Sequence, residues 1–137
     1  MAAPSNRPLI ERAAALLKPH KTADGRVFGD VAAAVVSETG RIFDGVCVDT
    51  ASWGLCAERS AIAAMVTAGE YRIASVVAVW RDATTGKLHV LPPCGHCRQF
   101  MRDLDDANLA TTIVLGSDMV RTLAELLPEH AWPAAIE

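Results

Sequence analysis

The sequence lacks the features of a membrane or secreted protein. No run reaches the roughly 18 uninterrupted apolar residues that a membrane-spanning helix needs. The first 30 residues hold no long apolar run and carry Arg7, Arg12 and Lys18, so we expect a soluble, cytoplasmic protein. An excess of basic charge is also missing, since 13 Lys and Arg stand against 16 Asp and Glu, a net charge of −3. We therefore expect no binding to nucleic acid or to a membrane surface.

Internal repeats, low-complexity tracts and linkers are missing as well, and 137 residues leave no room for a second domain. Because 51% of the residues are hydrophobic, a chain of this length can bury a core without disulfide bonds. We expect a single domain over residues 1–137, with its core from about 9 to 132.

Apolar periodicity and turn residues predict that helices and strands alternate along the chain. Helices are expected at 8–18, 57–68, 93–104 and 123–127. Strands are expected at 30–37 and 41–48, which form a hairpin, and at 73–80 and 111–115, which read as buried. This order predicts an α/β fold, a three-layer α-β-α sandwich with one mixed sheet between the helix layers.

The four cysteines indicate metal or thiol chemistry, because a chain without a secretion signal keeps its thiols reduced. Cys56, Cys94 and Cys97 lie where two helices are expected to begin, and the N-terminus of a helix stabilises a thiolate. Three protein ligands and one open position are typical of a catalytic zinc ion. A structural zinc site with Cys47 as the fourth ligand, and simply buried thiols, are the alternatives.

Glu58 follows Cys56 by two residues, close enough to reach a water on such a metal but poorly placed to bind the metal itself. We expect it to act as a general base, and the alternative is a carboxylate that only stabilises the start of the helix. The combination of Cys-x-Glu at 56–58 with Pro-Cys-x-x-Cys at 93–97 is the cysteine form of the zinc-deaminase signature.

These motifs resemble those of the cytidine deaminase superfamily in its small one-domain form, from about Leu9 to Trp132. Further matches are the stretch 40–46, the Arg-Gln pair at 98–99 and Glu-Leu-Leu-Pro at 125–128. The stretch 9–13 and the short length of segment 51–55 resemble blasticidin-S deaminases, whereas Arg59 and the Ala-Ser-Trp-Gly run at 51–54 resemble cytidine deaminases. The resemblance implies five strands in the mixed sheet, a homotetramer with shared sites, and zinc-dependent deamination of a cytosine nucleoside, as in pyrimidine salvage.

The resemblance also implies a role for each site residue. One Zn²⁺ per subunit is expected on the three cysteines, with Glu58 passing protons from water to ring nitrogen N3 and assisting the departure of ammonia. Arg59 and Gln99 are expected next to the metal ligands, where the positive charge of Arg59 offsets the negative charge of the sulfurs. The residues expected to contact the substrate are Phe28, Cys47, Asp49, Trp53, Ala57 and Trp132.

Two of these positions depart from the family, because Cys47 and Asp49 stand where cytidine deaminases carry Asn and Glu for the ribose hydroxyls. Because side chains alternate along a strand, Cys47 and Asp49 still share one face of it, and both can face the substrate pocket. Three functions therefore stay open: deamination of cytidine or deoxycytidine, deamination of blasticidin S, another modified cytosine compound or a free base, and binding of a nucleoside or RNA by an inactive zinc-stabilised protein. The acidic pI of 5.8 disfavours RNA.

Overall fold

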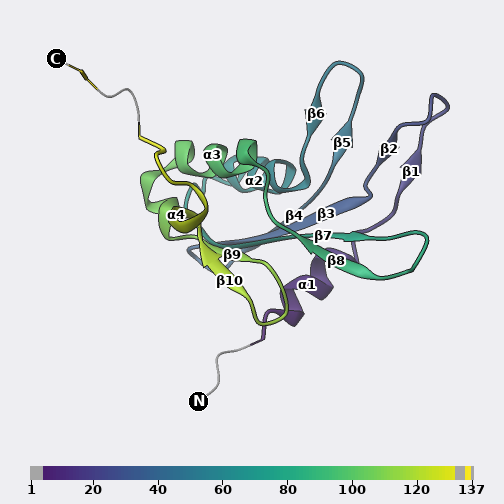
Figure 1. Ribbon diagram of the computed structural model, residues 1–137, viewed down its shortest axis with the longest axis horizontal. Coiled ribbons are helices and arrows are strands. Elements are labelled where there is room, and N and C mark those ends of the chain that lie inside the picture. Colours follow the sequence, from purple (N-terminus) through teal and green to yellow (C-terminus); the bar gives the residue numbers. More distant parts are fainter. Residues whose placement is uncertain (1–4, 132–134, 137) are drawn as a thin grey trace.

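A mixed sheet with helices on both faces forms the centre of the protein (Figure 1). The computed structural model describes residues 5–131 and 135–136. In chain order the elements are α1 (Arg7–Ala14), β1 (His20–Lys21), β2 (Val27–Phe28), β3 (Val31–Ser37), β4 (Ile42–Val46), β5 (Val48–Asp49), β6 (Gly54–Leu55), α2 (Ala57–Thr67), β7 (Ile73–Arg81), β8 (Leu88–Leu91), α3 (Gly95–Leu104), the 3-10 helix η1 (Asp106–Ala110), β9 (Thr112–Val114), β10 (Val120–Thr122) and α4 (Leu123–Leu126).

The sheet has the strand order β10-β9-β7-β3-β4, and β8 pairs with the other end of the long strand β7. Only β7 and β9 run parallel, so the sheet is mixed as expected. It has six strands rather than five. Strands β8 and β10 were not predicted, because runs of four and three residues are too short for a periodic signal.

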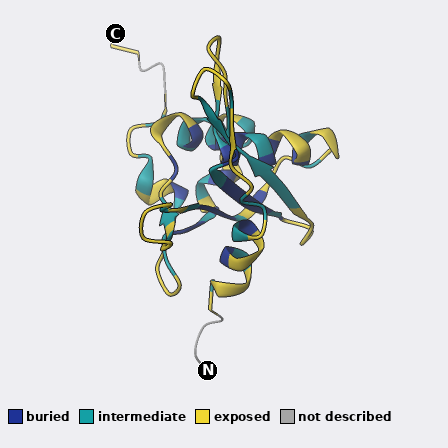
Figure 2. Ribbon diagram, turned by 90° about the vertical axis from the view of Figure 1, so that its right-hand side faces the viewer, coloured by how far each residue is buried: buried dark blue, intermediate teal, exposed yellow. Residues whose placement is uncertain are grey.

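The three-layer sandwich is confirmed. Side chains of β3 alternate between its two faces, so Ala33 and Val35 join the core beneath α2, whereas Ala32 and Ala34 join the core beneath α1. Figure 2 shows these buried segments in the interior and exposed residues along the outer sides of the helices. No helix in the described part of the chain is long and apolar enough to cross a membrane.

Helix boundaries differ from the prediction where the last or first turn changes geometry. Helix α1 ends at Ala14 rather than at residue 18, because the N–H groups of Leu16 and Leu17 bond three residues back. Helix α3 begins at Gly95 rather than at residue 93, because Cys94 keeps an extended conformation as its N-cap. Both changes leave the order of elements as predicted.

Gly45 of β4 holds the sheet and α2 at close range. A Cβ atom at this position would lie 2.3 Å from the Ala61 nitrogen and 2.7 Å from the Ala57 carbonyl oxygen. Only glycine therefore permits this separation. The contact sets the distance between β4 and α2, the helix whose N-terminus carries Cys56 and Glu58.

Candidate active site

The N-termini of two helices bring three thiols together. Cys56 is the N-cap of α2, Cys94 is the N-cap of α3, and Cys97 lies in the first turn of α3. Their sulfur atoms all lie within 4.8 Å of one another, and the Cys56 and Cys94 sulfurs are 3.9 Å apart. The Cys97 and His96 N–H groups at the start of α3 bond the Cys94 sulfur, and the positive end of each helix dipole favours negative charge on sulfur.

This thiol cluster has the dimensions and chemistry of a zinc site. A tetrahedral zinc ion with Zn–S bonds of about 2.3 Å separates its sulfur ligands by about 3.8 Å. The observed separation of 3.9 Å agrees with that edge. Cys47 lies outside the cluster and donates a hydrogen bond to Asp30 Oδ1 at 3.0 Å, so it is not placed as a fourth ligand. The residues present therefore fit zinc with three protein ligands.

The thiols perturb one another as expected for a site that accepts a cation. Burial raises the pKa of Cys97, and the neighbouring Glu58, Cys56 and Cys94 charges raise it further. Burial also acts to raise the pKa of Cys94. Hydrogen bonds from the Cys97 N–H and from the Cys97 and Cys56 side chains stabilise the Cys94 thiolate by more, so the pKa of Cys94 is lowered. Charge repulsion thus opposes full ionisation, and a divalent cation between the sulfurs would remove it.

Arg59 supplies one positive charge behind the cluster. Its Nη2 atom donates to the Gly54 carbonyl at 3.0 Å and lies 3.5 Å from the Cys56 sulfur. The hydrogen bond to Cys56 is the largest cause that raises the pKa of this buried guanidinium, and Cys97 contributes in the same sense. Trp53 covers the guanidinium with its ring centroid 5.2 Å away. The sequence predicted Arg59 beside the sulfurs, and the structure places it there.

Glu58 is buried, with only 6% of its surface exposed. Burial raises its pKa, and its own N–H and the Arg59 charge lower it by less. A carboxyl group whose pKa is moved toward neutrality is suited to take a proton and return it.

Glu58, Cys56 and Cys94 line a small cavity that we call the inner pocket. It has a volume of about 210 Å³ and is lined by Val31, Cys47, Cys56, Ala57, Glu58, Ala78, Leu91, Pro92 and Cys94. Its lining is mainly apolar and includes the Glu58 carboxyl group and cysteine sulfur atoms. A single planar heterocyclic ring with polar edges fits such a cavity better than a drug-sized ligand, which needs roughly 300 Å³ or more.

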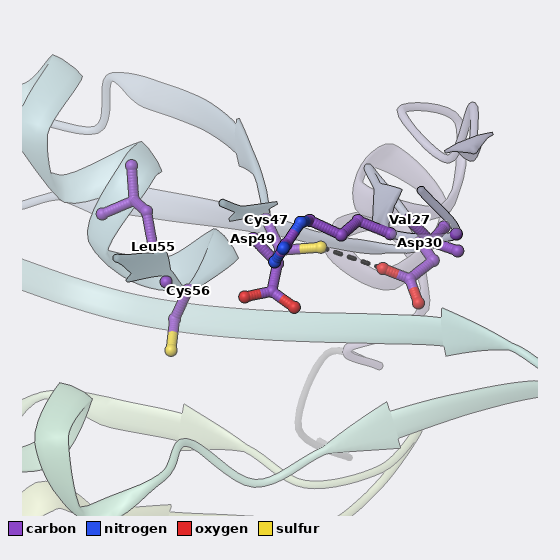
Figure 3. Close-up of a pocket in the computed structure, with 9 residues that line it drawn as sticks. Val27, Asp30, Cys47, Asp49, Leu55 and Cys56 are labelled. Atoms are coloured by element: carbon purple, nitrogen blue, oxygen red, sulfur yellow. Dashed lines mark hydrogen bonds between the residues drawn. The ribbon is translucent and has the colours of Figure 1, made fainter. Parts of the chain in front are cut away.

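A second and more polar cavity, the outer pocket, shares the lining residues Cys47 and Cys56 with the inner one. Figure 3 shows the residues that line the outer pocket. It has a volume of about 630 Å³ and is lined by Gly25, Arg26, Val27, Asp30, Cys47, Asp49, Gly54, Leu55 and Cys56. Cys47 and Asp49 both reach it, as the strand alternation predicts. Asp30 and Arg26 were not foreseen as pocket residues.

The other expected contacts lie elsewhere, apart from Ala57, which lines the inner pocket. Phe28 packs near the His20 ring, and its neighbour Val27 lines the outer pocket instead, because successive strand residues face opposite sides. Trp53 is 61% exposed and contacts Arg59 rather than a pocket. Gln99 donates to Asp103 at 2.9 Å along α3 and makes no bond to the sulfurs within the described ranges. Trp132 lies outside the described residues.

Arg98 contacts the segment before Cys94, a contact that the sequence analysis did not predict. Its Nε atom donates to the Pro93 carbonyl at 2.8 Å, and its Nη1 atom donates to the Leu126 carbonyl at 3.0 Å. It therefore ties the segment before Cys94 to the end of α4. The sequence signals for this contact were the match of Arg98 to the family's Arg-Gln pair and the Glu-Leu-Leu-Pro motif that contains Leu126.

Comparison with known proteins agrees with this geometry. Residues 7–113 match the family described as the cytidine and deoxycytidylate deaminase zinc-binding region. The chain belongs to this family. The family is one of zinc-dependent hydrolases, so the predicted resemblance and the predicted enzyme class are both confirmed.

Several curated relatives of the deaminase family resemble most of the chain. A cytidine deaminase from Halalkalibacterium halodurans is 36% identical over 104 residues, which are 72% of this chain and 74% of that protein. A blasticidin-S deaminase from Bacillus cereus is 29% identical over 103 residues, with 72% and 74% covered. The solved cytidine deaminase from Mycobacterium leprae has 31% identity and a TM-score of 0.70, covering 90% of this chain and 97% of that one.

Proposed function

We propose that this protein deaminates cytidine, deoxycytidine or a related cytosine nucleoside to the uracil product and ammonia. The observation that carries the proposal is the cluster of three thiols, two of which, Cys56 and Cys94, line the inner pocket together with the buried Glu58 carboxyl group. Family membership and the cytidine deaminase relatives support the reaction class.

Cys56, Cys94 and Cys97 would hold one zinc ion per subunit, which leaves one coordination position open. Bound there, zinc supplies a nucleophile at neutral pH by lowering the pKa of water. The partial charges of two helix N-termini and the Arg59 guanidinium stabilise the three thiolates. These charges are needed because three thiolates exceed the charge of the cation by one.

Glu58 moves the protons of the reaction. It takes one proton from water and gives it to ring nitrogen N3, while the oxygen of that water forms a bond to C4 of the pyrimidine. It then passes the second proton to the exocyclic amine, and the C4–N bond breaks to release ammonia. Water and the cytosine compound are thereby converted to the uracil compound and ammonia, with no oxidant or reductant.

The two cavities divide the substrate between them. The apolar walls of the inner pocket, including Ala57, enclose the base, and the outer pocket with Cys47 and Asp49 takes the sugar. The Bacillus cereus relative supports a second candidate, deamination of a modified cytosine compound such as blasticidin S.

We further propose that the protein acts as a homotetramer in the cytoplasm. Trp53 on the projecting β5–β6 hairpin and the small residues Ala63 and Ala64 on α2 are exposed and would suit contact with another copy. Reduced thiols, which the zinc site needs, are maintained in that compartment.

The experiment measures bound zinc and cytidine turnover in the same preparations. The wild-type protein is expected to bind one zinc ion per chain, and Cys56→Ser, Cys94→Ser and Cys97→Ser to lose it, whereas Cys47→Ser keeps it. Glu58→Gln is expected to keep zinc and to lose turnover by about 10²-fold to 10⁴-fold. Full turnover by Glu58→Gln, or zinc loss in Cys47→Ser equal to that in the three ligand variants, would contradict the proposal.

A further inference from the structure

We propose that Asp30 determines substrate specificity and that Cys47 positions it. Together with Asp49, Asp30 would select a substituent on the cytosine base that donates hydrogen bonds or carries positive charge, and would disfavour a phosphate. This inference rests on the proposed function, because it concerns the part of the substrate that leaves the inner pocket. Neither the sequence motifs nor the family match assigns a role to Asp30.

The backbone fixes Asp30 at the wall of the outer pocket. Gly29 adopts a φ of +74°, and a Cβ there would lie 3.2 Å from the Lys18 carbonyl oxygen, so this turn favours glycine. The Gly29 N–H donates to the Cys47 carbonyl, and the Cys47 N–H donates to the Val31 carbonyl, both at 3.0 Å. Asp30 is therefore held directly opposite Cys47 at the start of β3.

The Cys47 thiol orients the Asp30 carboxylate. It donates to Asp30 Oδ1 at 3.0 Å, and Figure 3 shows the sulfur pointing at that oxygen. An ionised carboxylate has about four acceptor positions on two oxygens, so this bond leaves the other oxygen, Oδ2, free to accept from a ligand. Both partners line the outer pocket and are half-buried, so the pair forms part of its wall.

The charges around the outer pocket favour a donor or a cation. Asp30 and Asp49 are the two carboxylates that line it, and Arg26 is the one cation among its described lining residues. The Arg26 Nε atom pairs with Asp24 Oδ2 at 3.0 Å, which offsets much of the arginine charge. Because carboxylates only accept hydrogen bonds, sugar hydroxyls or an ammonium group suit this wall, whereas a phosphate is repelled.

The test measures binding to zinc-loaded Glu58→Gln protein by titration calorimetry, so that no ligand is consumed. Cytidine, 5′-amino-5′-deoxycytidine and cytidine 5′-monophosphate differ at one substituent only. The Kd is expected to rise in the order amine, hydroxyl, phosphate. Adding Asp30→Asn is expected to reduce the ratio of the phosphate Kd to the amine Kd about tenfold, because one negative charge is removed from the wall.

Matched variants test whether the effect depends on where the negative charge is removed or only on the change in net charge. Asp118→Asn makes the same charge change in the exposed β9–β10 loop, away from the outer pocket, and is expected to leave the ratio unchanged. Cys47→Ser keeps a donor to Asp30 and is expected to preserve the ratio, whereas Cys47→Ala is expected to lower it severalfold. Equal ratios in the Asp30→Asn and parent proteins would overturn the inference, whereas ammonia release from cytidine by the wild-type protein would still uphold the proposed function. Absence of cytidine binding would contradict both.

Discussion

Replacing Gly45 with alanine tests whether the sheet sets the position of α2, the helix that carries Glu58. The added Cβ would lie 2.3 Å from the Ala61 nitrogen, 2.7 Å from the Ala57 carbonyl oxygen and 2.9 Å from the Ala61 Cα. All three are backbone atoms of α2, so no side-chain rotation relieves the overlap. Ordinary contact begins at 3.4 Å. Helix α2 must therefore move away from β4 by about 1 Å.

Both stability and activity should respond to this displacement. Overpacking of this kind costs about 1–3 kcal/mol, and for a domain of this size each kcal/mol lowers Tm by roughly 3–5 °C. Because Cys56 is the N-cap of α2 and Glu58 lies in its first turn, the same shift moves the carboxyl group relative to the sulfurs of α3. A misplacement of about 1 Å can reduce the rate by about 10²-fold.

The assay compares thermal unfolding, zinc content and cytidine turnover of Gly45→Ala with those of Gly116→Ala. A Cβ at Gly116 would meet only the Met119 Cβ, at 3.7 Å, so this control is expected to unfold and react like the wild type. A Gly45→Ala protein with unchanged Tm and unchanged kcat would refute the claim that the β4 contact sets the position of α2.

Three further substitutions test other parts of the account. Asn108→Ala removes a buried side chain that bonds three backbone groups, so we expect unfolding free energy to fall by about 3 kcal/mol or more in urea titration. The Ala107 N–H and the Arg72 guanidinium lower the pKa of Asp105 in the folded protein. The ionised Asp105 carboxylate therefore stabilises the fold above its ordinary pKa of 3.8, and this stabilisation is lost as the pH falls through the lowered pKa. The Tm difference between wild type and Asp105→Ala should accordingly be larger at pH 7 than at pH 3. Arg98→Ala frees the Pro93 carbonyl and should weaken zinc binding by about tenfold in a chelator competition, whereas unchanged affinity would remove Arg98 from the supporting contacts.

The sequence was sufficient for the layers of the fold and for the centre of the site. Alternating apolar runs and helix-start cysteines are local signals, and they placed Cys56, Glu58 and Cys94 at the ends of the correct helices. Arg59 was expected from the resemblance to cytidine deaminases, which agrees with the need to offset three thiolates, and it donates to sulfur in the structure. These features depend on spacing within one or two elements.

The features that the sequence did not predict depend on contacts between distant segments. Asp30 reaches the outer pocket because the Gly29 turn and Cys47 hold it there, and nothing in its immediate neighbours signals this. Phe28 was favoured for its aromatic ring, yet its strand phase directs Val27 to the pocket instead. The close approach of Gly45 to α2 likewise becomes visible only when both elements are in place.

Ammonia release tests the central claim most directly. Zinc-loaded protein is incubated side by side with cytidine, deoxycytidine, cytosine and blasticidin S, and Glu58→Gln protein of equal zinc content serves as the blank. We predict ammonia and the uracil product from the nucleosides, with none above background from the variant. Wild-type protein that holds one zinc ion per chain but releases no ammonia from any of the four compounds would contradict the account.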